Sequence, residues 1–207
     1  MAFARRNAIL VGAQTVAFLA VGVAQANVTV SNVPGDDGTS SVGLNNLSIK
    51  GVPFVTDGSA YFLDTATLRL NSSTAGIAPI LSLTASNSGV PGAVLTTFTN
   101  PGFFGTGIQK HVFTSVFQVA ANTKYWLVMQ GPVGGAAFDW KASSPAQTPT
   151  GLWTHSGSVF SSNGGSTYNN SSILTTYEID ATVVPEPATI AALGLGLLVL
   201  ARRRRKA

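Results

Sequence analysis

The chain has 207 residues, a formal net charge of +4 and no cysteine, which excludes disulfides and thiolate chemistry. The positive charge is concentrated at the two ends, because residues 1–6 and 202–206 hold seven of the twelve basic residues. Residues 27–184 hold five basic and seven acidic residues, a net charge of −2. Such a body lacks the basic footprint of a nucleic-acid-binding protein, and we predict no nucleic-acid partner.

The first 26 residues have the pattern of a secretory signal peptide. Residues 1–6 are short and cationic, residues 8–23 are apolar, and small residues at Ala24 and Ala26 supply a cleavage site. We therefore predict a signal helix over residues 1–26 that signal peptidase removes, with export by the general secretory route. The mature body would begin at Asn27.

Residues 27–183 alternate short apolar runs with turn-forming residues. The clearest predicted strand is 173–183, where odd-numbered positions are mostly apolar and even-numbered positions mostly polar, the period of a half-buried strand. Further strands are expected at 66–70, 80–85, 94–98, 112–119, 124–130 and 136–141.

Turns and loops separate these predicted strands. Residues 87–92 are turn-prone, and residues 33–41 and 161–172 are rich in Ser, Gly, Asn or Asp. No segment between the two ends keeps a helical period. The pattern predicts an all-β fold, an antiparallel and jelly-roll-like β-sandwich over residues 27–183.

The middle of the body resembles a known group of surface domains. The segments that carry the resemblance are Leu68-Arg69-Leu70, Leu81-Ser82-Leu83, Gly89-Val90-Pro91-Gly92 and the run from Ala121 to Val128. They occur in the order found in the "choice-of-anchor" domains, type R, over about residues 47–183. The resemblance implies a surface domain that pairs with alternative sorting tails, and it implies no catalytic residues.

Residues suited to catalysis are few. His111 and His155 lack the spacing of a zinc or protease motif, and residues 27–184 hold no nucleophile elbow. Glu178 and Asp180 would lie on one face of a strand, roughly 7 Å apart. That separation overlaps the carboxylate pairs of glycosidases, but a solvated strand face is the simpler explanation. We predict that the protein is not an enzyme.

Two oxygen-rich turns are weak candidates for metal binding. Asp36 and Asp37 precede Gly38, and Asp57 precedes Gly58. Carboxylate and carbonyl oxygens are the ligands of calcium, and secreted β-domains use it structurally. Asp-Gly is also a plain turn signal, so both interpretations stay open. No other cofactor is expected.

Aromatic residues suggest how a saccharide could be contacted. Trp153 and Tyr168 fall in loop-rich segments, where an exposed ring could stack on a sugar. The strand tryptophans Trp126 and Trp140 are expected to fill the core together with Phe113 and Phe117.

The last residues form a three-part signal. The motif Val184-Pro185-Glu186-Pro187 precedes an uncharged run of 14 residues, 188–201. A basic end follows, made of Arg202, Arg203, Arg204, Arg205 and Lys206. As a helix the run would be roughly 21 Å long, short for a permanent span. It predicts a short C-terminal transmembrane helix whose cations stop transfer at the cytoplasmic side, with a permanent single-span anchor as the alternative.

This tail, residues 184–207, resembles the PEP-CTERM sorting signal of Gram-negative bacteria. The resemblance implies transient residence in the inner membrane, processing by exosortase, and delivery to the cell surface or extracellular matrix, often beside exopolysaccharide in biofilms. Two function classes follow. The first is a non-catalytic exported surface or matrix protein. The second is a carbohydrate-binding module or carbohydrate-active enzyme that uses Trp153, Tyr168 and the carboxylates Glu178 and Asp180.

Overall fold

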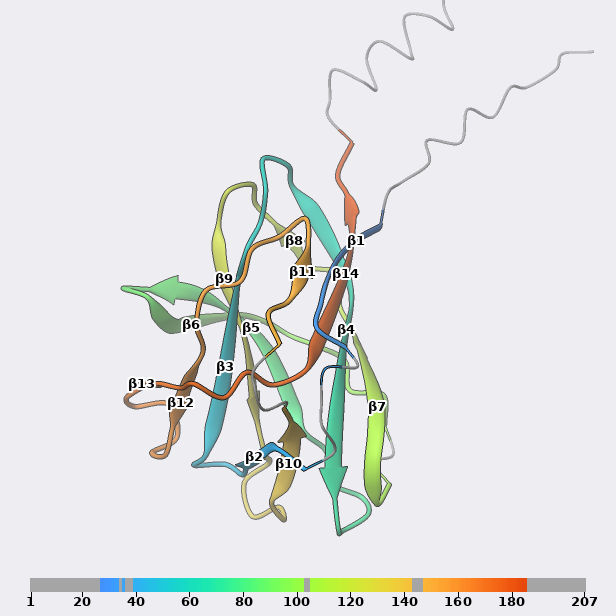
Figure 1. Ribbon diagram of the computed structural model, residues 1–207, viewed down its shortest axis with the longest axis vertical. Helices are drawn as coiled ribbons and strands as arrows, with labels where there is room; N and C mark the ends of the chain where they lie inside the picture. The colour runs from blue at the N-terminus through green and yellow to red at the C-terminus, as the bar shows by residue number, and fades with distance from the viewer. Residues whose placement is uncertain (1–26, 34, 36–38, 103–104, 143–146, 186–207) are drawn as a thin grey trace, which may run out of the picture.

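The computed structural model describes residues 27–33, 35, 39–102, 105–142 and 147–185 (Figure 1). These residues form strands and connecting loops, arranged as two antiparallel sheets, which confirms the all-β prediction. Within these ranges no helix occurs, so the described residues contain no candidate membrane-spanning helix. The predicted signal helix at 1–26 and transmembrane helix at 188–201 lie outside the described residues.

Sheet A has eight strands in the order β11-β1-β14-β4-β10-β2, and β7 and β8 also pair with β4. The central strand, β4, is long enough to hold four partners, since its 12 residues pair with β14 and β10 on one side and β7 and β8 on the other. Its strands are β1 (Asn27–Ser31), β2 (Ser41–Leu44), β4 (Tyr61–Ser72), β7 (Gly107–Thr114), β8 (Gln118–Val119), β10 (Phe138–Lys141), β11 (Thr150–Gly151) and β14 (Tyr177–Val183).

Sheet B has six strands in the order β13-β12-β3-β9-β5-β6. They are β3 (Ile49–Val55), β5 (Ile80–Asn87), β6 (Val90–Thr97), β9 (Lys124–Gln130), β12 (Val159–Ser161) and β13 (Asn169–Asn170). The β5–β6 hairpin turns on Ser88 and Gly89, whose φ angles are 50° and 87°. Positive φ at both positions suits a two-residue hairpin turn, so this turn is tighter than the predicted 87–92.

One apolar core lies between the two sheets. Alternate residues of each strand point into it, among them Leu68 and Leu70 of β4, and Val52 and Phe54 of β3. Alternate residues of β9 belong to two different clusters, one on each face of sheet B. Tyr125, Leu127 and Met129 belong to this core, whereas Trp126 and Val128 belong to a second cluster on the opposite face of sheet B.

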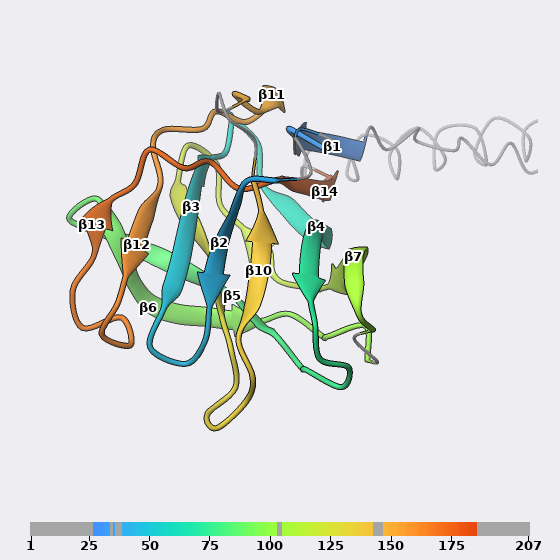
Figure 2. The ribbon, with the colours of Figure 1, turned by 60° about the horizontal axis from the view of Figure 1, so that its bottom comes forward.

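The two long sides of the body differ. On one side, a pair of backbone hydrogen bonds between Thr99 and Thr114 joins the end of β6 to the end of β7. On the other side, β2 ends sheet A and lies next to β3, while β12 and β13 end sheet B (Figure 2). Residues 171–176, here called the crossover, pass from β13 in sheet B to β14 in sheet A across this second side.

Two predicted strands are shorter than expected. The strand predicted at 173–183 begins only at Tyr177, because the crossover first binds to sheet A through the hydrogen bond from Thr176 N–H to the Lys141 carbonyl. Ile173 is accordingly exposed, although the alternation placed it on the apolar face. The strand predicted at 112–119 is divided into β7 and β8, and Val116 between them is 90% exposed.

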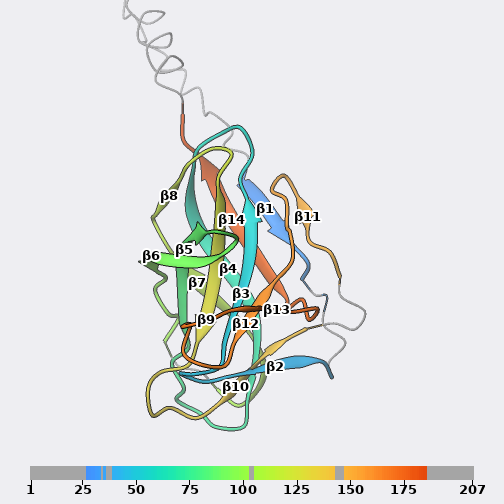
Figure 3. The ribbon, with the colours of Figure 1, turned by 90° about the vertical axis from the view of Figure 1, so that its left-hand side faces the viewer.

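Both ends of the body lie at one pole. Strands β1 and β14 pair in antiparallel register, and Asn27 is opposite Thr182. Figure 3 shows the start of β1 and the end of β14 together at the top of the body. The first and the last described residues therefore lie at the same pole of the body.

Candidate functional site

The described part of the sorting segment continues directly from β14. Val183 is the last residue of that strand, and the Val184 N–H donates a hydrogen bond of 2.9 Å to the Ala60 carbonyl. Pro185 follows and is exposed. Proline cannot donate to a neighbouring strand, so Pro185 cannot continue the backbone hydrogen bonding that Val184 still makes. Glu186, Pro187 and the basic residues 202–206 lie outside the described residues, as do Ala24 and Ala26.

Trp153 lies in the core and not on a surface. Its side chain is 2% exposed and stacks on Phe54, with ring centroids 5.0 Å apart and planes 9° apart. Tyr61 meets the same indole edge-on, at 5.3 Å and 77°. A buried ring cannot stack on a sugar, so the prediction of Trp153 as an exposed saccharide contact is wrong. Sequence suggested exposure because the flanking residues are typical of a loop.

Tyr168 lies away from Trp153, on the outer face of sheet B. It packs against a cluster of Ile49, Trp126, Val128 and Val159, here called the outer cluster. The ring is half-buried, and burial raises the pKa of its phenol. The structure does not bring Trp153 and Tyr168 together into one binding surface.

The two histidines occupy separate structural places. His155 Nδ1 lies 3.0 Å from both the Pro53 carbonyl and the Tyr177 hydroxyl. Since a carbonyl only accepts, this contact requires the proton on Nδ1. The pKa of His155 is lowered, chiefly by burial and also by the cation of Lys50, against the opposing effect of the carbonyl. His111 points inward from β7 opposite Leu68, and burial lowers its pKa as well.

The carboxylates Glu178 and Asp180 lie on the outer face of sheet A, as their spacing predicted. Glu178 accepts a hydrogen bond of 3.0 Å from the Ser31 hydroxyl. Asp180 accepts one of 3.1 Å from the Thr65 hydroxyl. Each carboxylate thus serves to join neighbouring strands, β14 to β1 and β14 to β4.

Asp57 holds a turn. Its carboxylate accepts hydrogen bonds from the Ser59 N–H at 3.0 Å and from the Tyr61 hydroxyl at 2.8 Å. This is the side-chain turn that Asp favours before Gly. Across the described residues, no three His, Asp or Glu side chains gather where they could hold a metal ion. Asp36 and Asp37 lie outside the described residues.

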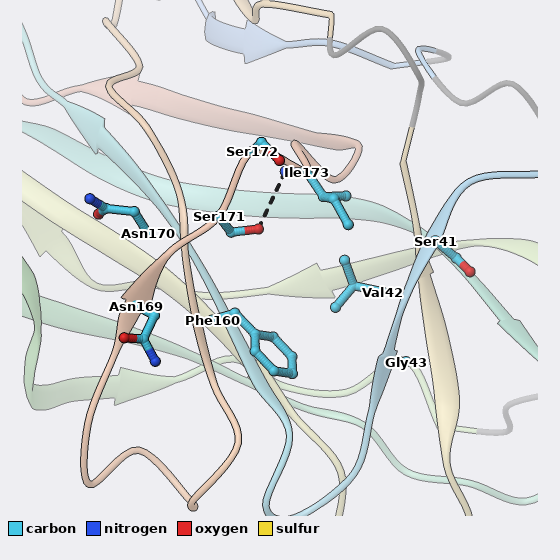
Figure 4. Close-up of a pocket in the computed structure, with 9 residues that line it drawn as sticks. All are labelled: Ser41, Val42, Gly43, Phe160, Asn169, Asn170, Ser171, Ser172 and Ile173. Carbon is cyan, nitrogen blue, oxygen red and sulfur yellow. Dashed lines mark hydrogen bonds between the residues drawn. The ribbon is translucent and has the colours of Figure 1, made fainter.

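A pocket of about 470 Å³ opens on the side of the body that the crossover spans (Figure 4). Edge strand β2 forms one wall, and β12 with β13 forms the other. The start of the crossover completes it. The lining residues are Ser41, Val42, Gly43, Phe160, Asn169, Asn170, Ser171, Ser172 and Ile173. Its volume falls within the range of roughly 300–1,000 Å³ that small-molecule sites occupy.

A buried lysine supports this pocket from inside. Lys50 is fully buried and shares the inward face of β3 with Val52 and Phe54. Its Nζ donates to the Ser158 hydroxyl at 3.0 Å, to the Ser171 hydroxyl at 2.7 Å and to the Ile173 carbonyl. All three acceptors are neutral, and burial lowers the pKa of Lys50 to about 8.

Sequence reasoning missed Lys50 and the whole pocket. The signal that was present is a lysine at an inward position of the apolar run Ile49–Val55, where an ordinary strand would carry a hydrophobic residue. The pocket has no local signal, because its walls come from β2 and from β12 and β13, which are more than a hundred residues apart.

Comparison with protein families matches residues 183–206 to the PEP-CTERM protein-sorting motif. This agrees with the resemblance seen in the tail, and the motif implies export and cell-surface sorting through exosortase. Comparison with curated proteins and with solved structures found no match. The resemblance of residues 47–183 to the choice-of-anchor domains stays a prediction.

Proposed function

We propose that this protein is a non-catalytic component of the cell surface or extracellular matrix, exported as a precursor and processed at both ends. The observation that carries the proposal is the sorting motif at residues 183–206, which begins where β14 ends. Signal peptidase would release the body at Asn27. Exosortase would then cut the tail while it is held transiently in the inner membrane.

The geometry of the two ends supports processing at one pole of the body. Because Asn27 pairs with Thr182, a body held at either end presents the same pole to the membrane. The exposed Pro185 continues from the last paired residues without a spacer, so exosortase would work close against this pole. We also infer that the two sheets form the predicted jelly-roll-like sandwich, supported by the core that they share.

A non-catalytic role is supported by the structural hydrogen bonds that the polar side chains make. His155 contacts a backbone carbonyl and a tyrosine, Glu178 contacts Ser31, and Asp57 contacts Tyr61. Each group stabilises a different connection. We propose association with exopolysaccharide as the role of the sorted body.

The test is intact mass spectrometry of the protein recovered from the surface of cells that contain exosortase. The expected mass begins at Asn27 and ends close to the Pro185-Glu186-Pro187 motif, together with any group attached there. The matched control replaces these three motif residues with alanine and should retain the tail. Full-length protein in both samples, or the same mass from cells that lack exosortase, would contradict the proposal.

A further inference from the structure

The pocket between β2 and β12 has one face built by a row of paired side chains. Lys50 of β3 is opposite Phe160 of β12, and Phe160 is opposite Asn169 of β13. Directly opposed residues of antiparallel strands lie on the same face of a sheet. A cation, an aromatic ring and an amide therefore follow one another from the interior to the rim.

Ser171 gives this pocket a directed donor. Its hydroxyl oxygen accepts a hydrogen bond from Lys50 Nζ at 2.7 Å and another from the Ile173 N–H at 3.3 Å (Figure 4). A serine hydroxyl has two acceptor lone pairs and one proton. Both lone pairs are occupied, so the proton is what Ser171 can still offer. The ammonium group behind it strengthens that donor.

The charge beneath the pocket selects the ligand. Lys50 contributes a positive charge whose hydrogen-bond acceptors are all neutral, and the residues that line the pocket are uncharged. In a low-dielectric interior, such a charge acts over a longer distance than one in water. One cation near a single strong donor complements one carboxylate, whereas phosphate sites usually gather several cations and backbone N–H groups.

The remaining walls suit a ring that has an apolar face and a polar edge. Phe160 and Val42 are apolar and point toward each other, while Asn169 supplies an amide group near the rim (Figure 4). Sugar rings combine C–H faces with hydroxyl edges, and aromatic side chains stack on those faces. We propose that this pocket binds an acidic saccharide, whose carboxylate accepts a hydrogen bond from the Ser171 hydroxyl and whose ring lies against Phe160. The inference deepens the proposed function and rests on it for the presence of polysaccharide.

Calorimetric titration of the full chain in a mild detergent tests the proposal. The probes are trigalacturonate and the neutral trisaccharide maltotriose, with inorganic phosphate as a third arm. We expect trigalacturonate to bind at least tenfold more tightly than the other two. Ser171→Ala should weaken trigalacturonate binding at least tenfold. Ser162→Ala, an exposed serine outside the pocket, should leave it unchanged.

Asn169→Ala provides a second variant on an exposed strand end, where truncation should cost little stability, and it should weaken the same binding severalfold. No binding of trigalacturonate, equal binding of maltotriose, tighter binding of phosphate, or normal binding by both pocket variants would each overturn the proposal. These outcomes are separate from tail processing. A chain that is cleaved but does not bind refutes only the ligand, and a chain that binds but stays uncut refutes only the sorting.

Discussion

On the outer face of sheet A, Glu178 and Asp180 accept hydrogen bonds from neighbouring strands, whereas the outer face of sheet B carries the apolar outer cluster. In β14 the burial alternates residue by residue, with Tyr177, Ile179 and Ala181 buried and polar residues between them. In β9, five consecutive residues from Tyr125 to Met129 are buried. Strand β14 of sheet A thus follows the polar-out, apolar-in rule, and β9 of sheet B does not.

The difference arises from what covers each sheet. The β5–β6 hairpin folds back over sheet B, which places Pro91 of β6 above Gly51 of β3 although β9 and β5 lie between these strands in the sheet. Trp126 lies beneath this cover, and its indole N–H donates to the Ser86 hydroxyl at 3.2 Å. The outer face of a sheet is therefore solvated only where no later segment folds over it.

The inner face of sheet B departs from the rule as well. Lys50 occupies an inward position that a hydrophobic residue would normally fill, and its Nζ holds the crossover in place. Sheet B thus has an apolar cluster outside and a cation inside. Both departures can be tested by substitution.

The largest expected effect comes from Trp126→Ala in the outer cluster. The side chain is 2% exposed, so truncation should lower the free energy of unfolding by about 3–5 kcal/mol, as in a core. Urea denaturation followed by circular dichroism measures this change.

Phe62→Ala is the matched control on the outer face of sheet A. Phe62 is 41% exposed on β4, where it is opposite Thr182, and its truncation should cost less than about 1 kcal/mol. Similar losses for the two variants would show that the two outer faces are equivalent and would break the comparison.

Sequence predicted strands of both sheets wherever an alternation or an apolar run is long enough to be seen. The alternation around Tyr177 identified β14, and the run 124–130 identified β9 with its observed bounds. The alternation in β4 around Leu68 was recognised over only part of its 12 residues, because a β-bulge beside Asp180 and Ala181 interrupts the pairing. Short strands such as β2, β12 and β13 have too few residues for a period to appear.

The candidate sites could be predicted only where the chemistry is local. The tail motif is contiguous and was found in full. For Asp57 the sequence offered a turn or a calcium ligand, and the turn could be proposed because Gly58 is adjacent and the observed partners Ser59 and Tyr61 are close in sequence. Trp153 was misplaced, since its burial depends on Phe54 and Tyr61, about a hundred residues earlier. Burial of this kind is decided by tertiary packing and not by neighbouring residues.

A smaller effect is expected from the pH dependence of Lys50. Its folded-state pKa is lowered to about 8 from 10.5, so the folded state releases the proton first as pH rises. The free energy of unfolding should therefore increase with pH between these two values, because the unfolded chain binds more protons there. Since one pKa unit corresponds to about 1.4 kcal/mol, the gain should reach about 2–3 kcal/mol.

The variant Lys50→Met isolates this contribution. Tyrosines also titrate at high pH in the unfolded chain, and burial raises the pKa of Tyr177 in the folded state, but both effects occur in wild type and variant alike. The free energy of unfolding of each protein is measured at about pH 7 and about pH 10. Between these two values the wild type should gain stability relative to the variant. A constant difference would mean that Lys50 has an ordinary pKa.

The smallest effect of the three is expected from adding one methyl group beneath the cover of sheet B. A Cβ at Gly51 would lie 3.0 Å from a Val159 methyl, 3.1 Å from the Pro91 ring and 3.4 Å from the Trp126 indole. Gly51→Ala should cost about 1–3 kcal/mol, because a packed site resists added volume. The same change at Gly58, where a Cβ would meet nothing within 4 Å, is the control and should stay within about 0.5 kcal/mol. If thermal unfolding shows equal stability for the two variants, the hairpin does not press on sheet B, and the outer cluster would then be a loosely covered surface instead of a second core.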